Sequence, residues 1–286
     1  MKIQEETVWS DVWPVVEALI QAVLAEDFEQ VRPLLEPNSI ADDMLDLYGY
    51  YVYDILLKSV LGRDKLAVTR AIETENGRYL HIEYAWPDVT TEDNHYTAND
   101  VVTATLTEKD GKWLITEVNP SAIDLPLNGG RARGVIAGGQ SLSEEGKVPG
   151  EAWILPYALY AGLLKMQLRE EALVDEVEQI LLLALQDRTY GVMAQIYGRR
   201  IWRDFKQTAD PALDKPEAWS AAIEYILAEQ ELRKVSQAAV AKQYKLTLSA
   251  MVPHIKQIKK ALNIQKSDER YSDIQSPQIV YNPNSN

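Results

Sequence analysis

The sequence predicts two folded parts, an α+β domain followed by an all-α domain. The chain has 286 residues, which is more than most single domains contain and enough for two. Apolar residues recur at helical spacing over residues 12–61, at the twofold spacing of strands over 66–118, and at helical spacing again over 153–262. Residues 126–150 include seven glycines and two prolines, and this composition predicts a flexible linker between the two domains.

The overall composition excludes several classes of protein. With 46% hydrophobic and 25% charged residues, the chain has the composition of an ordinary globular protein. No apolar run approaches the roughly 18 residues that cross a bilayer, and the acidic start of the chain differs from the basic start of a secretory signal. The absence of cysteine, together with only three histidines, argues against disulfides, thiol catalysis and zinc. We therefore expect a cytoplasmic protein with no membrane association, metal or cofactor.

Charge is distributed unevenly along the chain. Residues 1–122 carry 23 acidic and 9 basic side chains, a net charge of −14, whereas the remaining residues hold 20 of each. Within the second part, the segment from Arg233 to Lys260 has seven basic side chains and no acidic one. This segment is therefore a local concentration of positive charge in an acidic protein.

Three helices are expected at the start of the first domain. The first spans Val12–Ala25, with Asp11 or Ser10 as its N-cap. A short second helix spans Asp27–Leu35, and a third spans Ser39–Leu61, where a stripe of apolar and aromatic residues recurs every three or four positions.

The period then changes to that of β-strands. Strands are expected over Leu66–Ile72 and Arg78–Trp86, the second with strict alternation of its two faces. Asp100–Thr107 and Trp113–Val118 are expected to form a hairpin across the turn at 108–111, where a glycine supplies the positive φ that such a turn needs.

This order of elements resembles a known family. Three helices followed by an antiparallel sheet that ends in DGKWLITEVNP (Asp110–Pro120) are similar to the nuclear transport factor 2-like, or SnoaL-like, family over residues 9–122. The resemblance implies that residues 1–125 form a cone-like α+β domain, with helices packed on a curved antiparallel sheet around a cavity. Members of this family serve as ligand pockets or dimerisation modules, and some are enzymes that act on small hydrophobic molecules.

The resemblance gives candidate residues for a ligand pocket, which are Tyr48, Tyr51, Trp86 and Asp100. A small-molecule ligand in the N-terminal domain is therefore one expectation. None of these residues matches a catalytic motif, so no catalytic residue is assigned. The alternative is that the tyrosines belong to the core or to an interface, because aromatic stripes at helical spacing are more often core than site.

The second domain is expected to span residues 151–264 and to be all-α. The polar tail at 265–286 is predicted to be disordered, because it has too little apolar surface to offset the entropy of ordering it. Four helices are expected before the basic segment, at Trp153–Leu168, Ala172–Leu185, Gly191–Phe205 and Glu217–Gln230.

A cluster of cations on adjacent turns of the third of these helices has two interpretations. Arg199, Arg200, Arg203 and Lys206 could contact phosphate. The alternative, which we favour, is a solvated helix face paired with neighbouring acids such as Asp204.

The basic segment resembles the helix-turn-helix family over residues 235–262. Ser236 is placed to cap a helix that runs to Gln243, and Thr247 to cap the next one. The positions that match the family pattern are the first-helix glutamine, the core aliphatic, the small residue at the helix crossing, the turn aliphatic, the cap and the second-helix anchor, here Gln237, Val240, Ala241, Leu246, Thr247 and Met251.

Two residues depart from the family pattern. Lys245 replaces the usual turn glycine, so it must accept a left-handed conformation or a longer turn. Pro253 would be the sixth residue of the second helix and would remove a hydrogen bond there, which predicts a helix that is kinked or starts late. Both departures affect the turn and the second helix, which is the part of the motif that reads bases in this family. The lysines of the segment therefore suit phosphate contact better than base contact.

The resemblance implies a DNA-binding, transcription-regulator-like protein whose first domain senses a ligand or forms a dimer. One alternative is a non-enzymatic adaptor or self-assembling protein, whose basic segment binds the acidic domain of another copy. Another is a small-molecule enzyme of the cone superfamily. The candidate nucleic-acid contacts are Lys242, Lys245, Ser249, His254, Lys256, Lys259 and Lys260.

Overall fold

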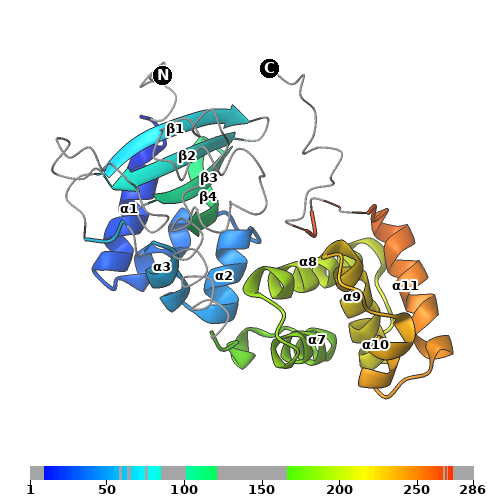
Figure 1. Cartoon of the computed structure of the whole chain (residues 1–286). Helices are drawn as coiled ribbons and strands as arrows, with labels where there is room; N and C mark the ends of the chain where they lie inside the picture. Colours follow the sequence, from blue (N-terminus) through cyan, green and yellow to red (C-terminus); the bar gives the residue numbers. More distant parts are fainter. Residues whose placement is uncertain are drawn as a thin grey trace, which may run out of the picture. The chain divides into compact units, whose positions relative to one another are not determined.

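The structure is a computed structural model of the chain (Figure 1), and it describes residues 10–57, 60–62, 66–74, 77–84, 101–120, 166–266, 268 and 270–272. The chain divides into two compact units, residues 1–166 and residues 167–286, which we call the N-terminal unit and the C-terminal unit. The fold is of the mixed α+β class, as predicted. The linker expected at 126–150 and the candidate pocket residues Trp86 and Asp100 lie outside the described residues.

The first helix of the N-terminal unit forms where the sequence predicts it. Helix α1 spans Trp13–Leu24, with Pro14 in its first turn, where a missing N–H costs nothing. Its N-cap is Val12, which makes no capping bond through its side chain, so the prediction of Asp11 or Ser10 as the cap was wrong. Burial of the apolar face, not a capping side chain, therefore stabilises the start of this helix.

The second predicted helix, Asp27–Leu35, is replaced by two short 3-10 helices. They are η2 (Phe28–Gln30) and η3 (Arg32–Leu34). Pro33 explains the difference, because it has no N–H to donate and its ring disfavours the α conformation at the residue before it. The chain therefore turns here in short steps.

The third predicted helix, Ser39–Leu61, is two helices in the structure. They are α2 (Ile40–Tyr48) and α3 (Tyr51–Leu56). The break falls at Gly49, whose φ of 71° is accessible to glycine at low cost. The apolar pattern alone does not reveal this break, because it continues in phase on both sides of the glycine.

The sheet of the N-terminal unit has four antiparallel strands in the order β1-β2-β3-β4. The hairpin between the last two turns at Asp110 and Gly111, whose φ values are 52° and 75°. Positive φ at both turn residues is the geometry that an Asp-Gly pair favours, and the predicted hairpin is confirmed. The strands span Leu66–Thr74 (β1), Gly77–Tyr84 (β2), Val101–Lys109 (β3) and Lys112–Pro120 (β4).

The core of the N-terminal unit lies between its helices and the sheet (Figure 1), and α1, α2 and α3 all contact β4. Ala104 pairs with Val118 and Leu106 pairs with Ile115 across β3 and β4, and all four side chains are buried. These strands therefore supply the apolar surface that the helices cover. Tyr53 also links two helices, since its hydroxyl donates to the backbone oxygen of Ala41 at 2.8 Å.

Gly77, at the start of β2, is expected to tolerate no side chain. An added Cβ would lie 1.8 Å from the backbone oxygen of Leu106 on β3. We expect Gly77→Ala to destabilise the N-terminal unit by about 2 kcal/mol or more in urea unfolding, because the strand backbone must shift. Gly111→Ala is the matched control, because its Cβ would meet nothing within 4 Å and would carry only the cost of a positive φ, about 1 kcal/mol. Equal losses for the two variants would contradict this prediction.

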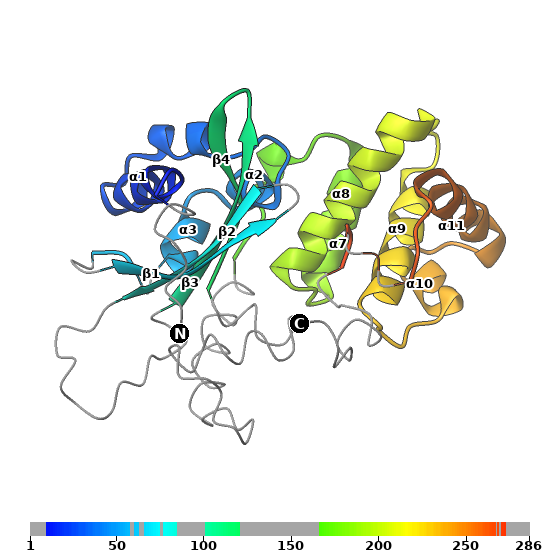
Figure 2. The same ribbon diagram turned by 90° about the horizontal axis from the view of Figure 1, so that it is seen from above.

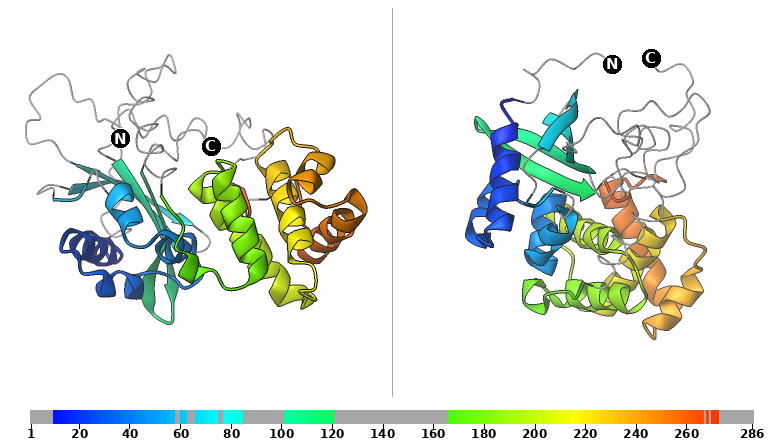
Figure 3. Two further views of the ribbon diagram at one scale, coloured as in Figure 1. Left: turned by 90° about the horizontal axis from the view of Figure 1, so that it is seen from below. Right: turned by 60° about the vertical axis from the view of Figure 1, so that its left-hand side comes forward.

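The described residues of the C-terminal unit form helices and no strand. Helix α9 lies between α8 and α11 (Figures 2 and 3) and contacts α7, α8, α10 and α11. No helix in the described part of the chain is both long enough and apolar enough to cross a bilayer. The helices are η5 (Glu170–Ala172), α7 (Glu176–Asp187), α8 (Val192–Ala209), α9 (Pro216–Gln230), α10 (Gln237–Gln243) and α11 (Leu248–Leu262).

A buried ion pair joins α7 to α8. The Arg199 Nε lies 2.8 Å from a carboxylate oxygen of Glu178, and both side chains are less than a tenth exposed. Burial raises the pKa of the Glu178 carboxyl above its usual range, and the charge of Arg199 opposes this rise. The sequence pattern does not reveal this pair, because hydropathy alone does not show that a cation from α8 lies beside Glu178.

A second polar group in the same region joins the start of α7 to α8. Asp175 is the N-cap of α7, and its carboxylate accepts from the backbone N–H of Glu178 at 3.0 Å, from the indole of Trp202 and from the Lys206 amine at 2.6 Å. Burial acts to raise the pKa of Asp175, but these hydrogen bonds hold it below its usual range. Arg199 and Lys206 thus form ion pairs within the unit. The favoured interpretation of this cationic cluster was right that acids pair with it, but wrong that its face is solvated, because Arg199 is buried, and the partners differ from those expected.

The predicted tail is ordered farther than the sequence indicated. Tyr271 is fully buried, and its hydroxyl donates to Asp204 at 2.7 Å. The Gln230 side chain of α9 binds the backbone on both sides, donating to the oxygen of Gln265 at 2.9 Å and accepting from the N–H of Asp268 at 2.8 Å. The prediction of disorder from residue 265 was therefore wrong for the described residues up to Ser272. The prediction rested on the low apolar content of the segment. In the structure, the buried ring of Tyr271 and the hydrogen bonds of the Gln230 amide attach the segment to the unit.

Candidate nucleic-acid interface

Local interactions that could be predicted from the sequence form helix α10 and the turn after it. The Ser236 Oγ accepts a hydrogen bond from the Ala239 N–H at 3.1 Å, which confirms Ser236 as the cap. After the helix, Lys245 has a φ of 56°, so it takes the left-handed conformation predicted for the residue that replaces glycine. The next N–H, that of Leu246, then returns to the backbone oxygen of Ala241 at 2.8 Å and closes the turn.

Helix α11 begins directly after this turn, with Thr247 at its N-cap position. The Thr247 hydroxyl contacts the Ser249 hydroxyl at 3.0 Å instead of capping a backbone N–H. Pro253 lies inside the helix, which continues through it to Leu262, so the expectation of a late start was wrong. The helix tolerates the proline because its buried side chains, Met251, Ile255, Ile258 and Leu262, all lie on one face.

The opposite face of α11 is exposed and basic. Ser249, Pro253, Lys256 and Lys260 follow one another at spacings of four, three and four, so they form one stripe along the helix, and all four are exposed. Lys242 on α10 and Lys245 in the turn are exposed as well. We call Lys242, Lys245, Lys256 and Lys260 the outer lysines. Among the described residues, none of the outer lysines has a carboxylate within ion-pair distance.

Two predicted contact residues lie on the flanks of α11. Lys259 forms an ion pair with Glu229 of α9 at 2.6 Å. His254 packs edge-on against the ring of Trp219, with 4.1 Å between ring centroids, and its Nδ1 lies 2.8 Å from the backbone oxygen of Ala250. Burial lowers the pKa of His254, which favours the neutral form of the ring. These positions suit packing and ion pairing within the C-terminal unit, and we leave both residues out of the interface.

A buried carboxylate attaches the α10–α11 pair to the rest of the C-terminal unit. Glu224 of α9 is 2% exposed and accepts from the hydroxyl of Tyr244, the residue that ends α10, at 2.6 Å. Arg188 forms an ion pair with the same carboxylate, and its guanidinium lies over the Tyr244 ring at 4.7 Å from the centroid. The more distant hydroxyl of Tyr190 lies 3.5 Å from the other oxygen. Burial and the adjacent Glu224 charge raise the pKa of Tyr244.

Sequence reasoning did not identify this anchor. Glu224 lies next to apolar residues in a helix whose period assigns it to neither face clearly, and Arg188 comes 36 residues earlier in the chain. Tyr244 lies among the residues that resemble the helix-turn-helix family, but the resemblance gives no partner for its hydroxyl. A buried tyrosine hydroxyl needs a hydrogen-bond acceptor. That requirement is the feature of the sequence that could have suggested a buried carboxylate beside Tyr244.

The two candidate ligand-pocket residues that the structure describes in the N-terminal unit differ in burial. Tyr48, at the end of α2, is buried, whereas Tyr51, at the start of α3, is 66% exposed. The break at Gly49 causes this difference, because it changes the direction of the chain between the two tyrosines. They therefore do not line one cavity wall as residues of a single continuous helix would.

Comparisons of the chain with protein-family models, with curated proteins and with solved structures give no match.

Proposed function

We propose that residues 235–262 form a helix-turn-helix module that binds the phosphate backbone of DNA, and that the protein is a regulator-like DNA-binding protein. One observation carries the proposal: the outer lysines are exposed on the α10–α11 pair and, among the described residues, lack carboxylate partners. Unpaired lysines on one surface attract phosphates and release their counterions, which is the main source of sequence-independent affinity for DNA. The absence of any acidic residue between Arg233 and Lys260 adds to this attraction.

The same surface offers little for reading bases. Base recognition in the major groove uses side chains such as arginine, asparagine and glutamine that form two hydrogen bonds with one base. The outward stripe of α11 begins instead with Ser249 and Pro253, followed by two lysines. Phosphate contacts position a protein on the duplex without reading its sequence. We therefore propose backbone binding with weak sequence preference.

For the N-terminal unit, we propose a nuclear transport factor 2-like domain that dimerises or holds a small ligand. Support comes from three helices that cover β4 of an antiparallel sheet. A dimer would place two α10–α11 pairs on one duplex and raise the affinity through effective concentration.

The test reverses the charge of two outer lysines. We expect Lys256→Glu with Lys260→Glu to weaken binding to duplex DNA at least about tenfold at 0.1 M salt, because two phosphate contacts become repulsive. The slope of log K against log salt should become shallower by about 2, close to one for each lost contact. Fluorescence anisotropy of a labelled duplex over a salt series measures both quantities, with thermal unfolding to verify that the fold is intact.

The matched control is Lys234→Glu with Lys266→Glu, which changes the net charge equally within the same unit, at two exposed lysines that belong to neither α10 nor α11. It should alter DNA affinity by less than about threefold. If the two double variants lose equal affinity, binding depends only on net charge and the proposed interface is wrong. Unchanged affinity in the Lys256 and Lys260 variant would contradict the proposal directly.

The charge distribution also favours a second candidate function, in which the basic surface binds the acidic residues 1–122 of another copy. Sedimentation of the DNA-free protein separates the candidates. Oligomers that form at low salt, dissolve at high salt and are lost in the Lys256 and Lys260 variant would favour self-association. A species whose size does not depend on salt would exclude it.

A further inference from the structure

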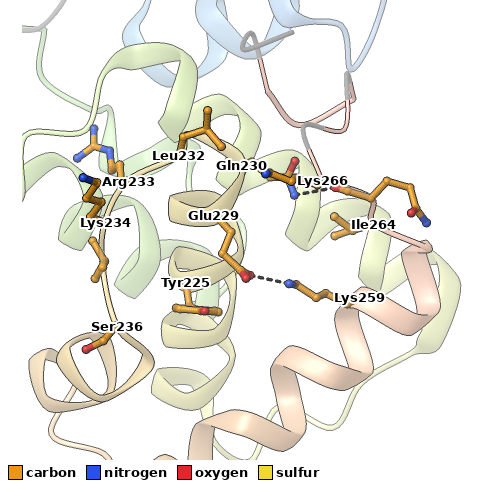
Figure 4. A pocket seen from close by; sticks show the side chains of 12 residues that line it. Tyr225, Glu229, Gln230, Leu232, Arg233, Lys234, Ser236, Lys259, Ile264 and Lys266 are labelled. Atoms are coloured by element: carbon orange, nitrogen blue, oxygen red, sulfur yellow. Dashed lines mark hydrogen bonds and ion pairs between the residues drawn. The ribbon is translucent and has the colours of Figure 1, made fainter. Parts of the chain in front are cut away.

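A pocket of about 580 Å³ opens in the C-terminal unit beside the proposed interface (Figure 4). Its walls come from the end of α9, from the segment at 232–236 and from the end of α11 with the residues that follow it. Pockets of roughly 300–1,000 Å³ are the size that holds small organic molecules. Neither the outer lysines nor the residues that bind Glu224 line this pocket.

The lining is strongly basic. Arg233, Lys234, Lys259 and Lys266 contribute four cations, against the single carboxylate of Glu229. Lys259 is paired with Glu229 at 2.6 Å, as Figure 4 shows, and Arg233 is paired with Glu231 outside the lining, also at 2.6 Å. Lys234 and Lys266 are exposed, and no carboxylate among the described residues pairs with them. Two amines are thus available to a ligand.

Helix dipoles explain part of this charge but not all of it. The C-terminal ends of α9 and α11 both lie at the pocket, and each carries roughly half a negative charge, which basic side chains would neutralise. The two ends together amount to about one negative charge. The lining carries three more cations than carboxylates, so a positive excess remains after the dipoles are counted. The pocket therefore attracts anions.

The pocket also has a wall suited to a flat or apolar group. The lining includes Tyr225 of α9 and the aliphatic side chains of Val235 and Ile264. An aromatic ring together with aliphatic side chains buries the body of an organic ligand, while a few polar groups set its orientation. An inorganic anion alone would leave this wall unused.

We propose that this pocket binds a small organic phosphate of nucleotide size, with Lys234 and Lys266 binding the phosphate and Tyr225 covering the organic part. Two further residues connect the site to the helix pair: Ser236 caps α10, and Lys259 belongs to α11. A bound phosphate also competes with Glu229 for Lys259. Ligand binding and DNA binding are therefore coupled, and by linkage each changes the affinity for the other by the same factor. Only this coupling depends on the proposed DNA-binding function.

The test uses the full chain and three probes, AMP, adenosine and pyrophosphate, in isothermal titration calorimetry without DNA. AMP should bind more tightly than pyrophosphate, because it also uses the apolar wall, and more tightly than adenosine, because it also uses the lysines. Lys234→Ala with Lys266→Ala should weaken AMP binding at least about tenfold through loss of charge-assisted contacts. Ile264→Trp, which narrows the pocket and keeps every charge, should weaken AMP binding as well.

The Lys256→Glu and Lys260→Glu variant serves as the control and should bind AMP as the parent does. That result separates the two proposals, since the same variant is expected to lose DNA. Failure of both AMP and pyrophosphate to bind at concentrations up to about 10 mM overturns the pocket proposal. AMP binding that is unchanged in both pocket variants overturns it too, because the ligand would then lie elsewhere.

Discussion

Replacing Arg199 by methionine should cost the C-terminal unit about 3–5 kcal/mol of unfolding free energy. The substitution keeps most of the side-chain length but leaves the Glu178 carboxylate, 3% exposed, without the guanidinium that lies 2.8 Å away. A buried carboxylate without a cation must be protonated or admit water, and each alternative costs free energy. Urea unfolding followed by the fluorescence of Trp202 and Trp219, which are both buried in this unit, measures the loss.

The double variant Glu178→Leu with Arg199→Met is the control for this prediction. Removing both charges leaves apolar groups of similar volume in the same space, and such exchanges are often neutral or stabilising. We expect the double variant to regain most of the lost stability. Two results would contradict the claim that Arg199 stabilises the buried carboxylate of Glu178. One is a cost of less than about 1 kcal/mol for Arg199→Met alone, and the other is a double variant that is as unstable as the single one.

The pH dependence of the loss gives an independent measurement. Since burial raises the pKa of Glu178 in the folded state, its contribution to stability is fully present below the unfolded-state pKa and is lost as pH rises through the folded-state pKa. Without Arg199, the folded-state pKa rises further. The deficit of Arg199→Met should therefore be largest near pH 7 and should shrink as the pH falls toward the usual pKa of a glutamate. A deficit that is constant with pH would contradict an electrostatic origin.

Features set by neighbouring residues could be predicted from the sequence, and features set by distant partners could not. The turn at Asp110 and Gly111, the cap at Ser236 and the left-handed Lys245 all depend on a few adjacent residues, and the structure contains all three. The cap Val12 shows that even a local rule fails when burial of the helix face decides the boundary.

The interactions that hold the C-terminal unit together connect residues far apart in the chain. Hydropathy assigns Glu178 to a polar face and Tyr271 to a tail, because the pattern records polarity but not the partner that offsets it. Arg199 and Asp204, which lie 21 and 67 residues away, supply those partners. The exposure of the outer lysines could be predicted, because an exposed side chain without an ion pair needs no distant partner. Lys259 differed because Glu229 lies on another helix.

Removal of Glu224 should produce the second large effect. We expect Glu224→Leu to destabilise the C-terminal unit by about 3 kcal/mol in urea unfolding, because it leaves the buried hydroxyl of Tyr244 unsatisfied and Arg188 without its carboxylate. Arg188 is one-quarter exposed and can turn toward water, which keeps the cost at the lower end of the range for buried pairs. Tyr244→Phe removes a single hydrogen bond to a charged group and should cost less, about 1.5–2 kcal/mol.

Glu224→Leu and Tyr244→Phe should also destabilise a different part of the C-terminal unit than Arg199→Met does. Glu224 and Tyr244 join α9 to the end of α10, so their loss should increase amide hydrogen exchange in residues 237–262 more than in α7 and α8. Arg199→Met should show the reverse pattern, because its ion pair joins α7 to α8. Uniform exchange in both variants would mean that the unit opens only as a whole. If the exchange is local, the Glu224 carboxylate holds the α10–α11 pair in position. Tyr244→Phe should then weaken the proposed DNA binding, although Tyr244 itself is buried and contributes no charge to the candidate interface.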